Sequence, residues 1–183
     1  MNVDAARRTV NPPSPAFLEW IMRFIDYLLN ARSVAARSAA RDWEEAIFKG
    51  GDSLVRTGCC DERYLAAIVE KCREVGPYIV IAPGIAMPHA RPEEGAKGVG
   101  FSLVTLSSPV EFDDTDNDPV DILIFMAADS AAAHVQEGVS QIADFCDNPV
   151  LIDRLRACAT DGEILDLLLS VELGSTTRGG TSR

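Results

Sequence analysis

The chain has 183 residues, of which 47% are hydrophobic and 25% are charged, and its 28 acidic and 17 basic residues give a formal net charge of −11. This composition is ordinary for a globular protein, and the length favours one domain with a sizeable core. The acidic balance argues against a nucleic-acid binder, which usually presents a basic face. No apolar run is long enough to span a bilayer, and the start lacks the features of a secretory signal, so we expect a cytoplasmic protein.

The cysteines and the acidic stretch of the chain do not indicate a metal site. Five cysteines occur without the C-x-x-C spacing of a zinc site, at positions 59, 60, 72, 146 and 158. An odd number without a secretion signal is typical of reduced thiols in a cytoplasm. A calcium loop starting at Asp114 would need a glycine and a glutamate where Pro119 and Phe125 stand. We therefore expect no metal and no other cofactor on this chain.

The first third of the chain is predicted to be mostly helical. Residues 17–29 form a short helix that is apolar around most of its circumference and therefore needs a covering surface. We favour packing on the domain or on a second copy of the chain over a membrane-surface anchor. Two more helices are predicted over residues 41–56 and 61–74, the first of them weakened midway by a pair of glycines.

The remainder of the chain is predicted to contain three buried strands and three further helices. The strands are nearly all apolar, so both of their faces should be covered, at residues 78–82, 100–106 and 120–127. The helices follow at residues 130–146, capped by Ser130, and at residues 149–157 and 163–169. The sequence therefore predicts an α/β fold, a layered α/β/α sandwich with a central mixed sheet and an extra N-terminal helix.

One segment carries most of the chemical information. It runs from Pro83 to Pro92 as Pro-Gly-Ile-Ala-Met-Pro-His-Ala-Arg-Pro, directly after an apolar strand. Because prolines fix φ and remove backbone donors, we expect a stiff loop that forms neither a helix nor a sheet ladder. Such a loop would present His89 to the outside. From the residues alone, His89 could be a general base, a metal ligand, a covalent nucleophile or a plain surface residue.

The residues around His89 resemble the active-site segment of a known family. Residues 76–92, and above all the Gly-Ile-Ala-Met-Pro-His core, are similar to the enzyme IIA components of the phosphoenolpyruvate-dependent sugar phosphotransferase system, in the mannitol/fructose-type class. The Ala-Arg-Pro that follows His89 most resembles the ascorbate-specific branch, as do residues 42–46, 101–106 and 117–120. The similarity extends from about residue 38 to about residue 169.

The resemblance implies roles for His89, His134 and Arg73, and the charge of Arg91 beside the histidine adds a fourth candidate. His89 falls on the phosphoacceptor histidine of the family, and His134 on its second active-site histidine, which would help to stabilise the phosphoryl group. Arg73 and Arg91 are candidates for phosphate contacts. A positioned imidazole can accept a phosphoryl group and pass it on, because little covalent work remains once charge and geometry are arranged.

The resemblance also implies partners and a division of the chain. The phosphoryl group would come from the carrier protein HPr and pass to a cysteine of an enzyme IIB, which works with a membrane permease. The sugar is expected to be ascorbate or a related sugar acid. Residues 1–30 would be a tail and an extra apolar helix, open to homo-oligomer contacts, residues 31–172 the enzyme IIA domain, and residues 173–183 a disordered tail.

Two other functions remain open at this point. A regulator of the same fold would use its phosphorylation state to control binding to a partner protein. A degenerate member of the family would only bind partners, although the presence of both histidines argues against it. Transfer to an enzyme IIB, as opposed to a stable complex, would separate these readings.

Overall fold

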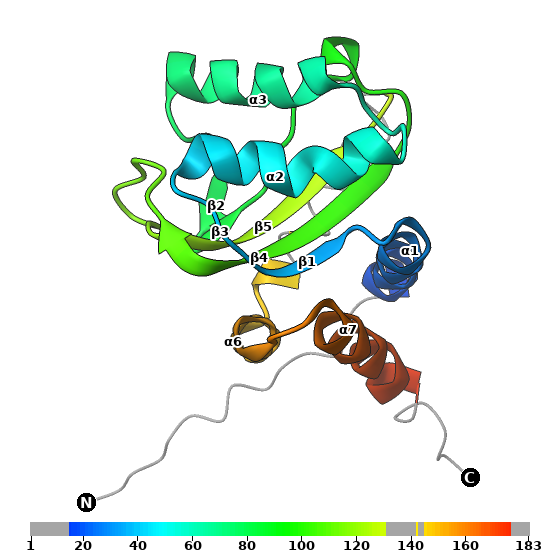
Figure 1. The fold of residues 1–183 in the computed structure, drawn as a ribbon. Coiled ribbons are helices and arrows are strands. Elements are labelled where there is room, and N and C mark those ends of the chain that lie inside the picture. Colours follow the sequence, from blue (N-terminus) through cyan, green and yellow to red (C-terminus); the bar gives the residue numbers. More distant parts are fainter. Residues whose placement is uncertain (1–14, 131–141, 143–144, 177–183) are drawn as a thin grey trace, which may run out of the picture.

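A computed structural model describes residues 15–130, 142 and 145–176 of the chain. Its centre is one five-stranded mixed sheet in the order β1-β4-β5-β3-β2 (Figure 1). The long strands β4 and β5 pair antiparallel, β1 runs parallel to β4, β3 runs parallel to β5, and β2 pairs antiparallel with β3. The bounds of the strands are Val34–Ser38 (β1), Val80–Ala82 (β2), Ile85–Ala86 (β3), Gly100–Val110 (β4) and Val120–Ala127 (β5).

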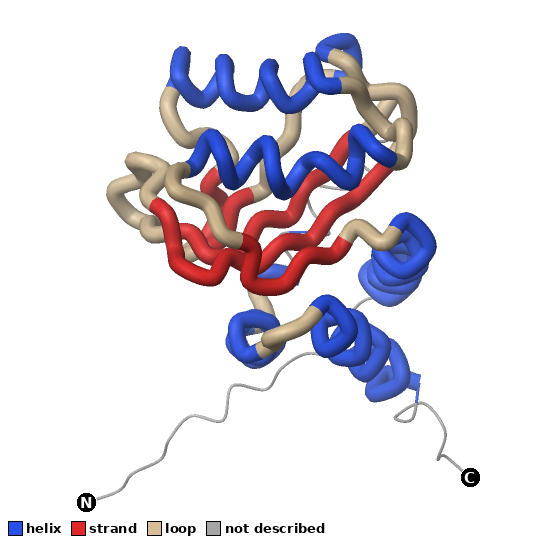
Figure 2. Tube along the Cα trace, viewed as in Figure 1, coloured by secondary structure: helices blue, strands red, loops and turns tan. Residues whose placement is uncertain are grey.

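Helices cover both faces of this sheet, which confirms the predicted α/β sandwich (Figure 2). On one face lie α2 (Trp43–Arg56) and α3 (Glu62–Val75). On the other lie α1 (Pro15–Ala31), α6 (Pro149–Ala157) and α7 (Asp161–Thr176). Among the described residues, no helix has both the length and the apolar composition needed to cross a membrane.

Short polar side chains set the starts of the helices. Asp42 accepts a hydrogen bond from the backbone N–H of Glu45 at 2.8 Å, and Asp61 accepts one from Arg63 at 3.1 Å. Asn148 does the same for the N–H of Leu151 at 3.1 Å. Each contact satisfies a donor that the first turn of a helix leaves without an intrahelical partner.

The sheet divides the core into two clusters of buried side chains. The cluster under α1, α6 and α7 includes Phe24, Phe101 and Phe145, and the rings of Phe24 and Phe101 meet edge to face with centroids 5.3 Å apart. The cluster under α2 and α3 includes Tyr64 and Phe125, both fully buried. Burial on both faces explains why β5 and residues 100–106 of β4 are mostly apolar, as predicted, whereas β4 continues to Val110 through three exposed residues.

Two strands were not expected from the sequence. The segment Val34–Ser38 carries only three apolar residues, two of them alanines, and gains its strand conformation by pairing with β4 at the sheet edge. The prediction that the proline-rich segment forms neither ladder nor helix is wrong in part. Ile85–Ala86 pairs with both β2 and β5, and Pro92–Glu94 forms one turn of 3-10 helix, here called η1. Pro83 and Pro88 flank β3 without belonging to it, so they take no donor from its ladder. Pro92 stands at the first position of η1, where no backbone donor is needed.

The paired glycines of α2 do not interrupt the helix. A Cβ at Gly50 would overlap the ring of Phe125, and one at Gly51 would overlap the side chain of Leu65. Both glycines therefore let α2 lie close to β5 and α3, and this packing outweighs their poor helix propensity.

The N-terminal helix is covered by the domain itself. Ile21, Phe24, Ile25 and Leu28 of α1 are fully buried, and α1 packs against α7 and β4. The expected packing of this helix on the domain is therefore confirmed, whereas its contact with a second copy of the chain stays a prediction. At the other end, α7 extends to Thr176, so the first residues of the expected C-terminal tail are helical. The helix predicted over residues 130–146 lies mostly outside the described residues.

Candidate functional site

A short hairpin brings the histidine segment to the end of the sheet. Gly84 forms the turn between β2 and β3 with a φ of +77°, a conformation that favours glycine. Its carbonyl accepts hydrogen bonds from the N–H groups of Asp121 and Ile122, at 2.9 and 3.0 Å. Arg156 of α6 donates to the Pro83 carbonyl at 3.2 Å and makes a bidentate ion pair with Asp121. The hairpin is therefore attached to both β5 and α6.

The His89 ring is oriented by the backbone two residues before it. Its Nδ1 lies 2.8 Å from the carbonyl oxygen of Met87. Because a carbonyl only accepts, Nδ1 carries the proton in this contact, and the lone pair of the neutral ring is on Nε2. Burial lowers the pKa of His89 below its usual value, more than the contact with Met87 raises it. The imidazole is thus kept neutral near pH 7, as a nucleophile requires.

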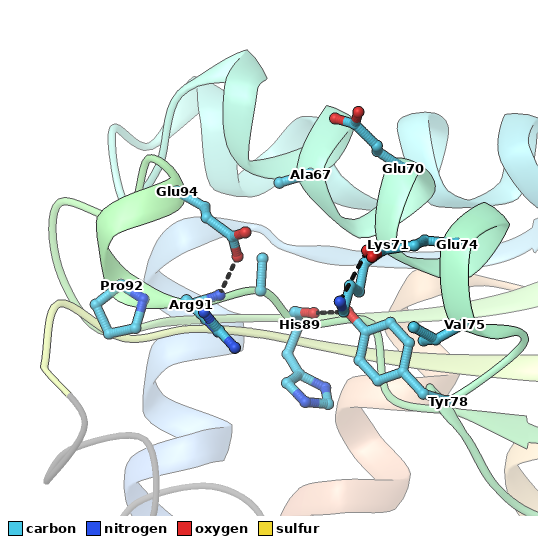
Figure 3. A pocket seen from close by; sticks show the side chains of 11 residues that line it. Ala67, Glu70, Lys71, Glu74, Val75, Tyr78, His89, Arg91, Pro92 and Glu94 are labelled. Carbon is cyan, nitrogen blue, oxygen red and sulfur yellow. Dashed lines mark hydrogen bonds and ion pairs between the residues drawn. The ribbon is translucent and has the colours of Figure 1, made fainter.

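Tyr78 contacts both the ring and the backbone of His89. The two rings meet edge to face with centroids 5.3 Å apart. The Tyr78 hydroxyl donates a short hydrogen bond to the His89 carbonyl, drawn as a dashed line in Figure 3. Burial raises the pKa of Tyr78, so this hydroxyl keeps its proton.

A cavity of about 860 Å³ opens between α3 and the segment that follows His89 (Figure 3). Its wall combines the apolar surfaces of Val75 and Tyr78 with charged side chains of both signs. Lys71 is paired with Glu74 at 2.8 Å within it. His89 borders this cavity, and in Figure 3 its imidazole points away from α3.

The two arginines predicted as phosphate contacts lie in different places. Arg91 lines the cavity together with His89, its side chain is exposed, and its backbone N–H donates to Glu94 at 2.6 Å. Arg73 makes a bidentate ion pair with Glu44 and lines a separate hollow with Trp43 and Phe112. The structure brings Arg91 and His89 together but places Arg73 outside this cavity. His134 lies outside the described residues.

The described residues contain no group of metal ligands, and burial makes two of the cysteines unreactive. No three histidine, cysteine or acidic side chains are grouped as metal ligands in the described part of the chain. All five cysteines are free thiols, and burial raises the pKa of Cys60 and of Cys146 to about 12. Such thiols are poor nucleophiles at neutral pH.

Comparisons with known proteins agree on one family. Residues 27–171 match the family described as the phosphoenolpyruvate-dependent sugar phosphotransferase system, EIIA 2. The ascorbate-specific PTS system EIIA component of Escherichia coli (strain K12) is 49% identical over 147 residues, which are 80% of this chain and 96% of that protein.

Solved structures show the same fold. The solution structure of the mannitol-specific cryptic phosphotransferase enzyme IIA CmtB from Escherichia coli has a TM-score of 0.72 at 32% identity, covering 80% of this chain and 98% of that one. The crystal structure of IIA mannitol from Escherichia coli has a TM-score of 0.65 at 25% identity, covering 75% of this chain and 96% of that one.

Proposed function

Because this chain belongs to the EIIA 2 family of the phosphoenolpyruvate-dependent sugar phosphotransferase system, whose members carry phosphoryl groups on histidine, we propose that His89 is its phosphoacceptor. The observation that supports this proposal most directly is the contact between Nδ1 of His89 and the Met87 carbonyl, at 2.8 Å. It holds a neutral imidazole in the one tautomer that has its lone pair on Nε2.

The proposed reaction uses Nε2 as the attacking atom. Its lone pair forms a bond to the phosphorus of phosphorylated HPr as the bond between phosphorus and the HPr imidazole breaks, and that electron pair stays on HPr. The proton remains on Nδ1, hydrogen-bonded to Met87. The phosphorylated ring is therefore cationic, which makes it a good donor in the following step, to a cysteine of an enzyme IIB.

Charge stabilisation is proposed to come from side chains around the acceptor. Arg91 lines the same cavity and is exposed, so it can turn toward the oxygens of the transferring group. We also propose His134 as a donor to these oxygens, on the resemblance alone. Arg73 would have to leave Glu44 to take part, which makes it the weakest of the candidates.

The physiological acceptor is proposed to be an enzyme IIB for ascorbate or a related sugar acid, in the cytoplasm. The similarity to the ascorbate-specific component supports this, since it covers nearly the whole length of that relative. Transfer from the phosphorylated chain to purified ascorbate-type and mannitol-type enzyme IIB proteins would test it. Faster transfer to the ascorbate type is expected, and equal or slower transfer would contradict the assignment.

The acceptor is tested by phosphorylating the full chain with phosphoenolpyruvate, enzyme I and HPr. Intact mass should increase by one phosphoryl group that is stable to base and labile to acid. The chain has only two histidines, so His89→Gln and His134→Gln form a complete pair. His89→Gln should take up nothing, whereas His134→Gln should still be phosphorylated, more slowly. Normal phosphorylation of His89→Gln would overturn the proposal.

A further inference from the structure

The backbone around His89 changes its hydrogen-bond partners at one point. Up to Pro88 the segment is held by neighbouring strands and the residues next to them. The N–H of Met87 donates to the Ile79 carbonyl at 2.7 Å, and the N–H of Met126 donates to the Pro88 carbonyl at 3.3 Å. The next peptide, between His89 and Ala90, takes both of its partners from side chains.

Those partners are two tyrosine hydroxyls from different elements. The carbonyl of this peptide, on His89, accepts from Tyr78, which stands just before β2. Its N–H, on Ala90, donates to the hydroxyl of Tyr64 on α3 at 3.1 Å. The Tyr64 hydroxyl in turn lies 2.8 Å from the Met126 carbonyl, nearer than the 3.2 Å to the Ala90 carbonyl, so its single proton is directed to β5.

Both hydroxyls are suited to hold a fixed geometry. Tyr64 is fully buried, and its ring lies within the core under α2 and α3. Burial raises its pKa to about 12, so it stays a neutral donor. Ala90 is itself buried, so its N–H would have no protein partner in place of Tyr64 unless the segment moved.

We propose that Tyr64 and Tyr78 are positioning residues for phosphoryl transfer, whose hydroxyls hold the two polar ends of the His89–Ala90 peptide and so fix the direction of the His89 imidazole. This proposal rests on the proposed role of His89 as the acceptor. A peptide plane fixed at both ends restricts the backbone angles next to the His89 Cα, and those angles limit the side-chain rotamers that set where Nε2 points. Transfer depends on such alignment.

The test uses single hydroxyl deletions in the full chain. Tyr64→Phe and Tyr78→Phe remove one oxygen each and keep the rings, including the edge contact between Tyr78 and His89. The third tyrosine provides the matched control, because the Tyr27 hydroxyl contacts Cys59 at 2.8 Å and Thr57 at 3.3 Å instead. Tyr27→Phe therefore removes a half-buried hydroxyl that does not touch the histidine segment.

Two readouts separate positioning from general stability. In single-turnover transfer from phosphorylated HPr, the maximal rate should fall roughly tenfold to a hundredfold for each site variant, with little change in the half-saturating concentration. Tyr27→Phe should match wild type. In nitrogen NMR of the imidazoles, assigned with His89→Gln, wild type should show the proton on Nδ1 of His89. The site variants should show a mixture of tautomers and a titration midpoint nearer the usual histidine value.

Wild-type rates together with wild-type imidazole spectra in folded Tyr78→Phe would overturn the proposal, as would an equal loss of rate in Tyr27→Phe. If Tyr64→Phe does not fold, Tyr78→Phe decides. If wild type takes up no phosphoryl group at all, the proposed function fails, and the imidazole spectra still show whether the hydroxyls orient the ring.

Discussion

The central strand pair and the histidine segment are held together in different ways. β4 and β5 pair residue by residue from Gly100 opposite Ala127 to Thr105 opposite Ile122, by backbone groups alone. The segment from Pro83 to Ala90 has only two paired strand residues and a few further backbone hydrogen bonds. Its remaining support comes from the side chains of Arg156, Tyr64 and Tyr78. In a ladder the loss of one backbone hydrogen bond leaves many others in place, whereas no second contact replaces a lost side-chain support at the site. Substitutions in the ladder should therefore cost stability, and substitutions at the supports should cost activity.

The largest expected effect is on the ladder. Phe125→Ala removes a fully buried ring from β5, and it should lower the free energy of unfolding by about 3–5 kcal/mol. The rate of phosphorylation per folded molecule should stay near wild type, because the ring of Phe125 makes none of the hydrogen bonds that hold the histidine segment. Urea unfolding and single-turnover transfer measure the two quantities. A large fall in the phosphorylation rate of the folded fraction would contradict the view that the ladder affects stability alone.

A smaller loss is expected where α2 approaches the sheet. Gly50→Ala places a methyl group against the ring of Phe125 and should cost about 1–3 kcal/mol, despite the better helix propensity of alanine. Gly162→Ala is the matched control, because the nearest atom to a Cβ there is Thr160 Oγ1 at 4.0 Å. The control should be neutral or stabilising in thermal unfolding. Equal behaviour of both variants would show that the close approach is unimportant.

The support of the hairpin by α6 should matter more for activity than for stability. Arg156→Leu removes the contact with Pro83 and the ion pair with Asp121, whose N···O distance is 2.8 Å. Because the guanidinium is about one-third exposed, the loss of stability should be only about 1 kcal/mol. The rate of phosphorylation should fall severalfold as the hairpin becomes less well fixed. Arg154→Leu, an exposed arginine of the same helix, should change neither quantity.

The smallest effect concerns pH. Burial lowers the pKa of His89 in the folded state below 6.5, the ordinary value expected in the unfolded chain. As the pH falls below 6.5, the unfolded state binds the proton more readily, so the contribution of His89 to stability is present above this value and declines below it. The difference in melting temperature between wild type and His89→Gln should therefore shift against wild type from about pH 8 to about pH 5. A constant difference would contradict the lowered pKa.

The parts of the fold that the sequence predicted are those held by local patterns. Val120–Ala127 was predicted with its observed bounds, because eight consecutive residues with little polarity specify a strand buried on both faces. The helices α2 and α3 were predicted within two residues at each end from the spacing of their apolar residues, and the caps at Asp42 and Asp61 agree with these starts. The motif singled out His89 as the candidate phosphoacceptor, a role that stays a prediction, and the residue borders a cavity.

What the sequence did not indicate depends on partners far away in the chain. β1 and β3 are too short or too polar to be recognised alone, and they exist because β4 and β5 offer them donors and acceptors. Tyr64 could be predicted only as part of a buried helix face, and nothing nearby in the sequence connects its hydroxyl with Ala90, 26 residues away. The contact of Arg156 with Pro83 spans 73 residues.

The amino-acid sequence by itself determined the alternation of helices and strands, the identity of the candidate phosphoacceptor and the family to which the chain belongs, since these depend on local patterns and on one short motif. Only the tertiary structure decided that α1 completes the core, that Arg73 is paired with Glu44 while Arg91 shares the cavity with His89, and that two tyrosines hold the His89–Ala90 peptide. These features are contacts between elements, and a contact is fixed by packing the whole chain.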